Sequence, residues 1–210
     1  MFRTLIFSIF LVCVVNIQAQ ELKVIKLNAP DKTRGSAIMK ALNDRQSIRE
    51  YKSESLRPQD LSDLLWAAMG INRPDGRRTS PTARNLQDVE MYVIFPEGVY
   101  HYDPKEHALN PVSAGDFRDA VASGQDFVKD APMSIVLVAD MSKHGNMSES
   151  SKLMAAVDIG IVCQNINVAC AGLGLATVPR GTMNQEALKT ALKLSDQHLL
   201  LMNNPVGYPK

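Results

Sequence analysis

The sequence predicts an α+β fold, and three features indicate it. Apolar residues recur at helical spacing in some segments, while other segments are short apolar, β-branched runs with the length of strands. The two kinds of segment are mixed without the regular strand–helix–strand alternation of a parallel sheet. Between Ser150 and Ala171 a long segment is apolar nearly all round, which is typical of a helix in a core or at a subunit interface.

The N-terminal segment differs from the rest of the chain. Arg3 precedes an apolar run from Leu5 to Val15, and Ile17-Gln18-Ala19 resembles a cleavage site. The run is short for a membrane span and has the length of a secretory signal. We therefore expect a signal peptide at residues 1–19, an extended arm at 20–35 and one domain at 36–210. The mature protein is expected to be exported, in the periplasm, without stable membrane insertion.

Composition limits the classes of function. The 210-residue chain is 45% hydrophobic and 21% charged, as expected of one globular domain. Its 23 Lys and Arg against 22 Asp and Glu argue against a dedicated binder of nucleic acid or anionic membrane. Cys163 and Cys170 lie about 10 Å apart on the predicted helix, too far for a disulfide. We expect two buried thiols, no metal site, and histidines at surface or loop positions.

The individual elements follow from local patterns. Residues 35–45 have apolar positions at helical spacing, and Pro58 to Gly70 is the clearest helix because a proline starts it and a glycine ends it. Residues 72–85 form an Arg-, Pro- and Gly-rich loop, and the runs 89–95 and 98–102 form a hairpin. The remaining elements are a helix at 114–128, a buried strand at 132–140, the long helix, a turn and strand at 172–181, a helix at 184–194 and a last strand at 198–209.

Two segments offer side chains for a ligand. In "RQSIR", Arg45 and Arg49 are one helical turn apart with Ser47 between them, which suits an anion. The alternative is a solvated turn in which the two arginines pair with neighbouring acidic residues. In "SPTARNLQ" the Asn85 carboxamide offers both a donor and an acceptor for the edge of a heterocycle. The alternative here is a loop that caps the next strand.

A third segment, "GLGLATVPRG" from Gly172 to Gly181, exposes backbone groups or serves as a helix C-cap. It is not a dinucleotide fingerprint, because it follows a helix instead of opening one. Taken in order, the three segments resemble the FMN-dependent nitroreductase family over residues 36–210. The resemblance implies an FMN phosphate site at Arg45, Gln46, Ser47, Arg49 and Lys210, a ring contact at Pro81, Thr82, Asn85 and Gln87, and contacts to the N5/O4 edge at Pro179, Arg180 and Gly181.

The resemblance also implies a central, mainly antiparallel sheet flanked by helices, and a homodimer built around the long helix with FMN at its interface. A narrower likeness over residues 81–109 is to the dehydrogenase branch that includes the azoline (thiazoline/oxazoline) oxidases. Two departures stand out. Asp88-Val89 replace the Pro-Trp of many relatives, and the chain ends at Lys210 without their C-terminal tail.

The implied activity is a ping-pong transfer of a hydride or electrons from a donor, with NAD(P)H a candidate, to a small organic acceptor such as a nitroaromatic or a quinone. No catalytic side chain is implied, and Arg84 and Arg180 are either flavin-tuning or surface arginines. Export conflicts with a cytoplasmic donor such as NAD(P)H. The alternative function is an exported, non-catalytic binding protein that keeps the fold with a degraded flavin site.

Overall fold

The middle layer of the computed structural model, which describes residues 21–210, is a seven-stranded sheet. Its strands are β1 (Ile25–Lys26), β2 (Val89–Phe95), β3 (Gly98–Asp103), β4 (Ala108–Ala114), β5 (Met133–Asp140), β6 (Ala176–Thr177) and β7 (His198–Gly207). They lie in the order β1-β4-β3-β2-β5-β7-β6, and every neighbouring pair is antiparallel. The predicted signal peptide, residues 1–19, lies outside the described residues.

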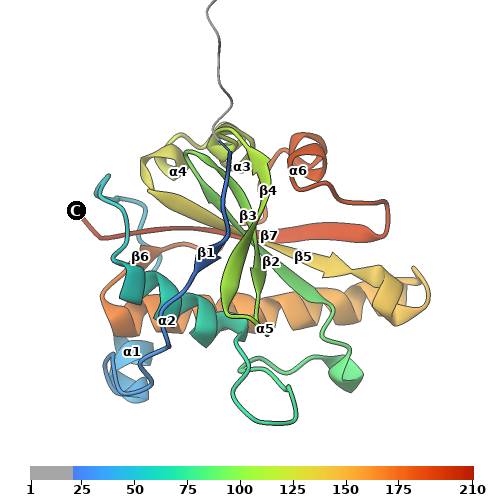
Figure 1. The fold of residues 1–210 in the computed structure, drawn as a ribbon, viewed down its shortest axis with the longest axis horizontal. Helices are drawn as coiled ribbons and strands as arrows, with labels where there is room; N and C mark the ends of the chain where they lie inside the picture. The colour runs from blue at the N-terminus through green and yellow to red at the C-terminus, as the bar shows by residue number, and fades with distance from the viewer. Residues whose placement is uncertain (1–20) are drawn as a thin grey trace, which may run out of the picture.

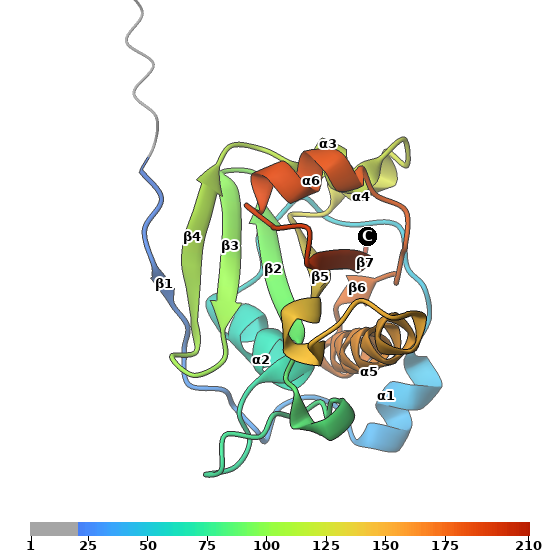
Figure 2. The ribbon, with the colours of Figure 1, turned by 90° about the vertical axis from the view of Figure 1, so that its right-hand side faces the viewer.

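Helices cover both faces of the sheet. They are α1 (Ile38–Asp44), α2 (Pro58–Met69), α3 (Arg118–Ala122), α4 (Phe127–Asp130), α5 (Glu149–Leu173) and α6 (Gln185–Ala191), with 3-10 turns η1 (Ala83–Asn85) and η2 (Met141–His144). Figures 1 and 2 show α3, α4 and α6 on one face, α2 and α5 on the other, and α1 outside α5. The predicted α+β class and mainly antiparallel sheet are therefore confirmed.

The alternation of strand side chains builds two cores. Val89, Met91 and Val93 of β2 pack with α2 and α5, whereas Tyr92 and Ile94 of the same strand pack under α3 and α6. This is the period of two that a strand imposes, and it explains why the central strands are apolar on both faces.

The two large helices begin and end where local signals place them. Pro58 occupies the first turn of α2, and Gly70 follows its last residue. A Cβ at position 70 would lie 2.3 Å from Cδ1 of Trp66, so only glycine fits there. Ser148 caps α5 by accepting the N–H of Ser151, and Gly174 ends the helix in a left-handed conformation. The long central helix is thus confirmed.

Other elements differ from the expectations. The helix predicted at 114–128 is two short helices, because Ser123 and Gly124 adopt positive φ angles of 45° and 85°. β4 was not among the predicted strands; it contains Pro111, which the sheet accommodates beside a bulge at Val99/Tyr100. The N-terminal arm contributes β1, which pairs with β4.

Among residues 21–210, α5 is the one helix long and apolar enough to cross a membrane by length and composition. In this fold one stripe of it is buried, comprising Ala155, Asp158, Ile159, Val162, Cys163, Ile166, Asn167 and Cys170. A core helix passes the same test of length and composition, and this stripe packs into the core between α2 and the sheet. Cys163 and Cys170 are free, buried thiols, as expected.

Candidate functional site

The segment that follows α1 is not helical. α1 ends at Asp44, and from there the chain runs beside the C-terminal strand. The Ile48 N–H donates to the Thr177 carbonyl at 3.0 Å, and Tyr51 forms a bridge with Pro209. The expectation that Arg45 and Arg49 project from one face of a helix is therefore wrong, because pairing with distant residues replaces helical hydrogen bonds.

A hollow of about 420 Å³ opens at this segment. It is lined by Gln46, Ser47, Ile48, Arg49, Glu50, Pro209 and Lys210. The structure thus brings together four of the residues predicted for a phosphate, because Gln46, Ser47 and Arg49 meet Lys210 from the C-terminus of the chain. Arg45 is not among the lining residues and lies half-buried just before them, at the end of α1.

The cationic side chains here are not neutralised by their neighbours. Asp44 pairs with Lys40, whose Nζ lies 2.5 Å from Oδ2, and not with Arg45. Within residues 21–210 the side chains of Arg45, Ser47, Arg49 and Lys210 form no hydrogen bond or ion pair. The alternative of a self-paired charged turn is therefore not what the chain forms, and the donor set suits an anion.

The second predicted segment is a tightly held loop around η1. Arg84, Asn85 and Gln87 all have positive φ angles, of 53°, 56° and 50°. Thr82 accepts the Gln87 N–H through Oγ1 at 2.8 Å, and the Gln87 carboxamide donates to the Gly76 carbonyl. Thr82 and Gln87 are therefore occupied in shaping the loop.

Three residues of this loop remain open to a ligand. Pro81, Arg84 and Asn85 are exposed. Asn85 uses its backbone N–H within the loop, on the Thr82 carbonyl, but its carboxamide makes no hydrogen bond within the described part of the chain. The arrangement leaves this carboxamide and the Arg84 guanidinium as the polar groups that the loop presents.

The loop is fastened from below by buried titratable residues that the sequence did not predict. Both carboxyl oxygens of Asp158, on α5, accept the Ala83 N–H, at 3.0 and 2.9 Å. His144 donates from Nε2 to Oδ2 of Asp88 at 2.8 Å. His144 is only 8% exposed, so its expected surface position is wrong. Asp158 is a charged residue within the otherwise apolar segment that forms α5, and it is the one signal in the sequence that could have pointed to this cluster.

Arg180, in the third segment, is buried and structural. Its three guanidinium nitrogens donate to the carbonyls of Val121 and Ala122, to Gln125 Oε1 and to Asn203 Oδ1. Its backbone N–H and C=O both pair with Asn203. The guanidinium is therefore held by the protein's own acceptors, and the alternative of a surface arginine is wrong. Pro179 is half-buried and Gly181 exposed, so any backbone contact from this segment falls to them.

The predicted segments lie in two places. The first and third are neighbours, since Ile48 bonds Thr177, two residues before Pro179. The Asn85 loop is attached to α5 at Asp158. Fourteen residues later on α5, the Gly172 carbonyl accepts the N–H of Ser36, which precedes α1. Fourteen residues of helix span about 21 Å. Figure 1 shows the C-terminus beside the C-terminal end of α5 and the green turn after α2 towards the other end.

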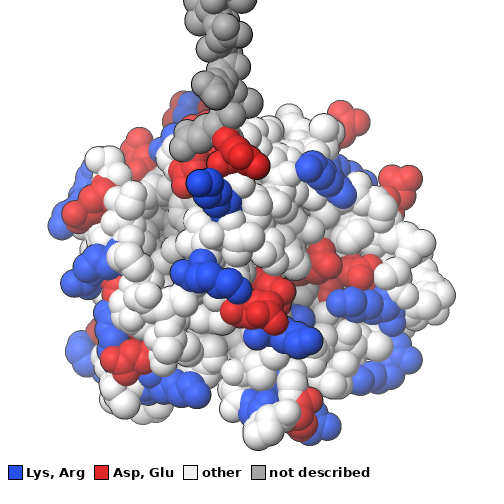
Figure 3. All heavy atoms as spheres, viewed as in Figure 1, with Lys and Arg blue, Asp and Glu red and all other residues white. Residues whose placement is uncertain are grey.

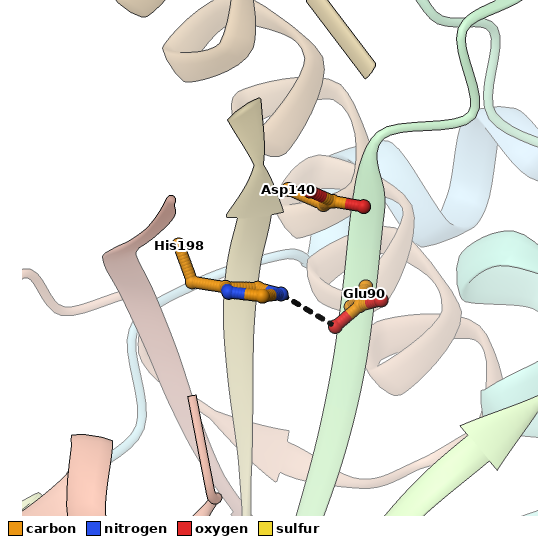
Figure 4. Close-up of side chains that lie close together, drawn as sticks. All are labelled: Glu90, Asp140 and His198. Atoms are coloured by element: carbon orange, nitrogen blue, oxygen red, sulfur yellow. Dashed lines mark ion pairs between the residues drawn. The ribbon is translucent and has the colours of Figure 1, made fainter. Parts of the chain in front are cut away.

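A separate cluster joins three neighbouring strands. Glu90, Asp140 and His198 point into one space from β2, β5 and β7 (Figure 4), with ligand-type atoms within 4.8 Å of one another. The Ser195 N–H donates to Nδ1 of His198 at 3.2 Å, and Nε2 of the same ring lies 3.8 Å from the Glu90 carboxylate. The cluster is thus a histidine–glutamate pair with Asp140 beside it.

The surface adds two further features. Figure 3 shows basic and acidic side chains interspersed over the face in view, so the free cations of the hollow are not part of a broad basic patch on that face. Large apolar side chains are exposed on α1 and α5, among them Ile38 (62%), Met39 (74%) and Leu153 (64%). Groups of this kind normally mark an interaction surface.

Comparison with known proteins gives one consistent result. Residues 42–208 match the sequence profile described as the nitroreductase family. A candidate nitroreductase of Methanocaldococcus jannaschii is 31% identical over 173 residues, which are 78% of this chain and 86% of that protein. The FMN reductase (NAD(P)H) of Bacillus subtilis is 26% identical over 187 residues, 82% of this chain and 66% of that protein. The crystal structure of a candidate nitroreductase from Ralstonia eutropha superposes with a TM-score of 0.83 at 35% identity, covering 89% of this chain and 90% of the other.

Proposed function

The chain belongs to the nitroreductase family and is an FMN-dependent oxidoreductase, and on this basis we propose that it transfers electrons from a donor such as NAD(P)H to a small organic acceptor such as a nitroaromatic or a quinone. The observation that carries the proposal is the hollow beside Ser47, Arg49 and Lys210, whose side chains have no partner within residues 21–210. Free cations around a hydroxyl group fit a phosphate.

The chain's own residues divide the work of holding FMN. Arg49, Ser47 and Lys210 bind the phosphate, and Arg45 adds its charge from the end of α1. The exposed Asn85 carboxamide addresses the ring, and the exposed backbone at Gly181 addresses its edge. When bound, the flavin supplies the redox chemistry, accepting a hydride from the donor and passing electrons to the acceptor in turn. We assign no side chain as acid or base.

We further propose that the site is completed in a homodimer. The outward face of α5 carries Leu153, Met154 and Val157, which are 64%, 44% and 48% exposed. Gly160 lies near the middle of α5, and nothing is within 4 Å of the position a Cβ would take there. A glycine at this point lets a second helix approach closely. The exposed apolar residues and the glycine support pairing of two copies along α5.

A two-fold axis through the middle of α5 would place the first half of one helix beside the second half of its partner. The Asn85 loop is attached to the first half, and the phosphate-binding segment lies at the end of the second half. The pairing would therefore bring the loop of one subunit towards the hollow of the other. A single chain holds these two features about 21 Å apart along the helix axis.

Export and the choice of donor remain linked proposals. The signal-like residues 1–19 support export to the periplasm; a periplasmic location would require a small reduced carrier as donor, and a cytoplasmic location would fit NAD(P)H. The likeness of residues 81–109 to the azoline-oxidase branch favours assaying a dehydrogenation as well as a reduction. N-terminal sequencing of the mature protein, together with cell fractionation, tests the location.

The cofactor proposal has a direct test. The purified protein is expected to be yellow and to release FMN on denaturation, whereas the non-catalytic alternative predicts a colourless protein that cannot be reconstituted. Arg49→Ala with Lys210→Ala removes the two charged donors that line the hollow, worth about 1.5–3 kcal/mol each, so the Kd for FMN should rise by about two to four orders of magnitude. Lys189→Ala with Lys193→Ala removes the same charge from α6 and the turn that follows it, and should leave the Kd unchanged. Equal affinity in both double variants would refute the phosphate assignment.

Gly160→Leu tests the homodimer. The open space around Gly160 means that the leucine should fit the isolated chain and stabilise the helix, but it should block close approach of a second α5. We expect a folded monomer by light scattering, with weakened FMN binding. A monomeric variant that binds FMN as the parent does would contradict the shared site, and an unchanged dimer would contradict the α5 interface.

A further inference from the structure

We propose that Asp158 is a positioning residue for the Asn85 loop, and that it acts in its protonated form, with the proton shared with Asp88. The inference rests on the proposed function, because it assigns the loop to the flavin ring. In this arrangement Asp158 accepts the backbone N–H of Ala83 and at the same time donates its own proton to Asp88. One side chain of α5 thereby fixes both ends of the loop.

The geometry begins with three buried groups under η1. Asp88 is fully buried, Asp158 is 2% exposed and His144 is 8% exposed. Asp158 approaches Ala83 with both oxygens, at 3.0 and 2.9 Å from the amide nitrogen. The charge of Asp88 acts directly on Asp158, so the two carboxyl groups are neighbours. No lysine or arginine forms an ion pair with either carboxyl within residues 21–210.

An unpaired atom indicates where the proton is. Oδ2 of Asp88 accepts the His144 ring N–H, but Oδ1 of Asp88 is buried and has no hydrogen-bond partner among the described residues. A buried carboxylate oxygen without a donor is costly, and two adjacent buried carboxylates cannot both ionise readily. A proton on Asp158 removes both difficulties, because its O–H supplies the donor that Oδ1 lacks.

The electrostatics agree with this placement. Burial raises the pKa of Asp158; the Ala83 N–H opposes this, and the charge and hydrogen bond of Asp88 add to the increase. The other charged groups around the cluster are His144 from η2, Lys143, whose Nζ donates to the Gln87 carbonyl, and Arg78, which donates to the Val89 carbonyl. None of the three forms a hydrogen bond with Asp158.

The loop needs such fastening because its backbone is strained. Three of its four residues from Arg84 to Gln87 are left-handed and are not glycine, a conformation that costs about 1 kcal/mol or more for each. It persists only where the surroundings determine it. Asp158 holds the loop at Ala83, Asp88 follows its last residue, and Lys143 binds the Gln87 carbonyl. The exposed Asn85 carboxamide is thereby held in one place.

Two variants separate the effect of the Asp158 proton from the effect of removing the side chain. In Asp158→Asn the carboxamide oxygen still accepts the Ala83 N–H, and its N–H replaces the O–H toward Asp88. In Asp158→Ala both bonds are lost. We expect the Kd for FMN to rise by about tenfold to a hundredfold in Asp158→Ala, the equivalent of one or two hydrogen bonds, and to stay within about threefold of the parent in Asp158→Asn.

The second measurement is amide hydrogen exchange of residues 82–88 in the flavin-free protein. Exchange should accelerate in Asp158→Ala and not in Asp158→Asn. Asn85→Asp is the matched control: aspartate tolerates the left-handed conformation as asparagine does but lacks the N–H donors, so it should weaken FMN binding without changing loop exchange. In the parent, exchange should rise with pH as Asp158 loses its proton, whereas Asp158→Asn should lack that pH-dependent increase beyond the intrinsic exchange rate.

These outcomes test the role of Asp158 separately from the proposed FMN-dependent activity. If Asp158→Asn exchanges as fast as Asp158→Ala, the shared proton is wrong, and if neither variant changes exchange, the positioning role is wrong. If Asp158→Ala does not fold, the pH dependence of Asp158→Asn against the parent still decides. If no form of the protein binds FMN, the proposed function fails, while the exchange data continue to test the loop.

Discussion

Replacing Arg180 with methionine should destabilise the protein without acting on the flavin directly. Arg180 is 7% exposed, and its guanidinium donates to the carbonyls of Val121 and Ala122 at the end of α3 and to Asn203. Methionine fills similar volume but donates nothing, so these three buried acceptors lose their donors, as does Oε1 of the exposed Gln125. At about 1 kcal/mol for each, the free energy of unfolding should fall by about 3 kcal/mol.

The loss corresponds to a melting temperature lower by roughly 6–12 °C for a chain of this size. It should be measured by calorimetry on flavin-free protein, because bound FMN would add its own stabilisation. Arg84→Met is the matched control. Arg84 is exposed and its side chain makes no hydrogen bond within residues 21–210, so the substitution should change stability by no more than about 0.5 kcal/mol.

The opposite pattern would refute the structural role. If Arg180→Met melts as the parent does, and the reduction potential of the loaded protein falls, the guanidinium charge acts on the flavin and its hydrogen bonds to α3 contribute little. A change in the potential for Arg84→Met alone would instead leave Arg84 as the tuning residue.

Three further substitutions have defined outcomes. Asp60→Asn should lower the free energy of unfolding by about 3 kcal/mol at neutral pH and flatten the acid side of the pH–stability curve measured by urea titration. Burial raises the pKa of Asp60, but hydrogen bonds from Tyr208 and two arginines outweigh burial, so the pKa lies below 3.8. The stabilisation is therefore present above pH 3.8 and is lost as the pH falls through the lowered pKa. Gly70→Ala should destabilise by about 1–3 kcal/mol in thermal melts, because the added Cβ would lie 2.3 Å from Trp66; an unchanged melt would mean that the side chain moves away freely. Lys193→Gly should stabilise by about 1 kcal/mol, because the residue adopts a φ of 56° after α6, and no gain in melting temperature would count against strain there.

Elements with strong local signals were predictable from the sequence. Pro58 and Gly70 bound α2, and the length and apolarity of α5 identified it, because capping and periodicity act within a few residues. The prediction of a single helix at 114–128 was wrong. Its periodicity is helical, but Ser123 and Gly124 turn left-handed and separate two short helices; the Ser-Gly pair is a turn signal that the helical periodicity masked.

The candidate site was predictable by residue type and not by geometry. The sequence selected Arg45, Ser47 and Arg49 as a cationic group, yet it placed them on a helix. Their segment instead pairs with residues near the C-terminus, more than 150 positions away along the chain. Long-range pairing of this kind overrides local preference, and no spacing within the segment records it. The buried bond between Asp88 and His144 is hidden for the same reason.

Sequence order also conceals which segments can meet. The three segments follow one another along the chain as though one copy supplied them all. In the structure α5 separates them, because Asp158 near its first half holds the Asn85 loop and Gly172 near its end adjoins the phosphate-binding side. A straight helix cannot bend to close a gap of about 21 Å. Either the loop serves a purpose apart from the hollow, or a second copy brings its own loop across. The exposed residues Leu153, Met154 and Val157, with Gly160 after them, lie on the helix along which the second case requires contact.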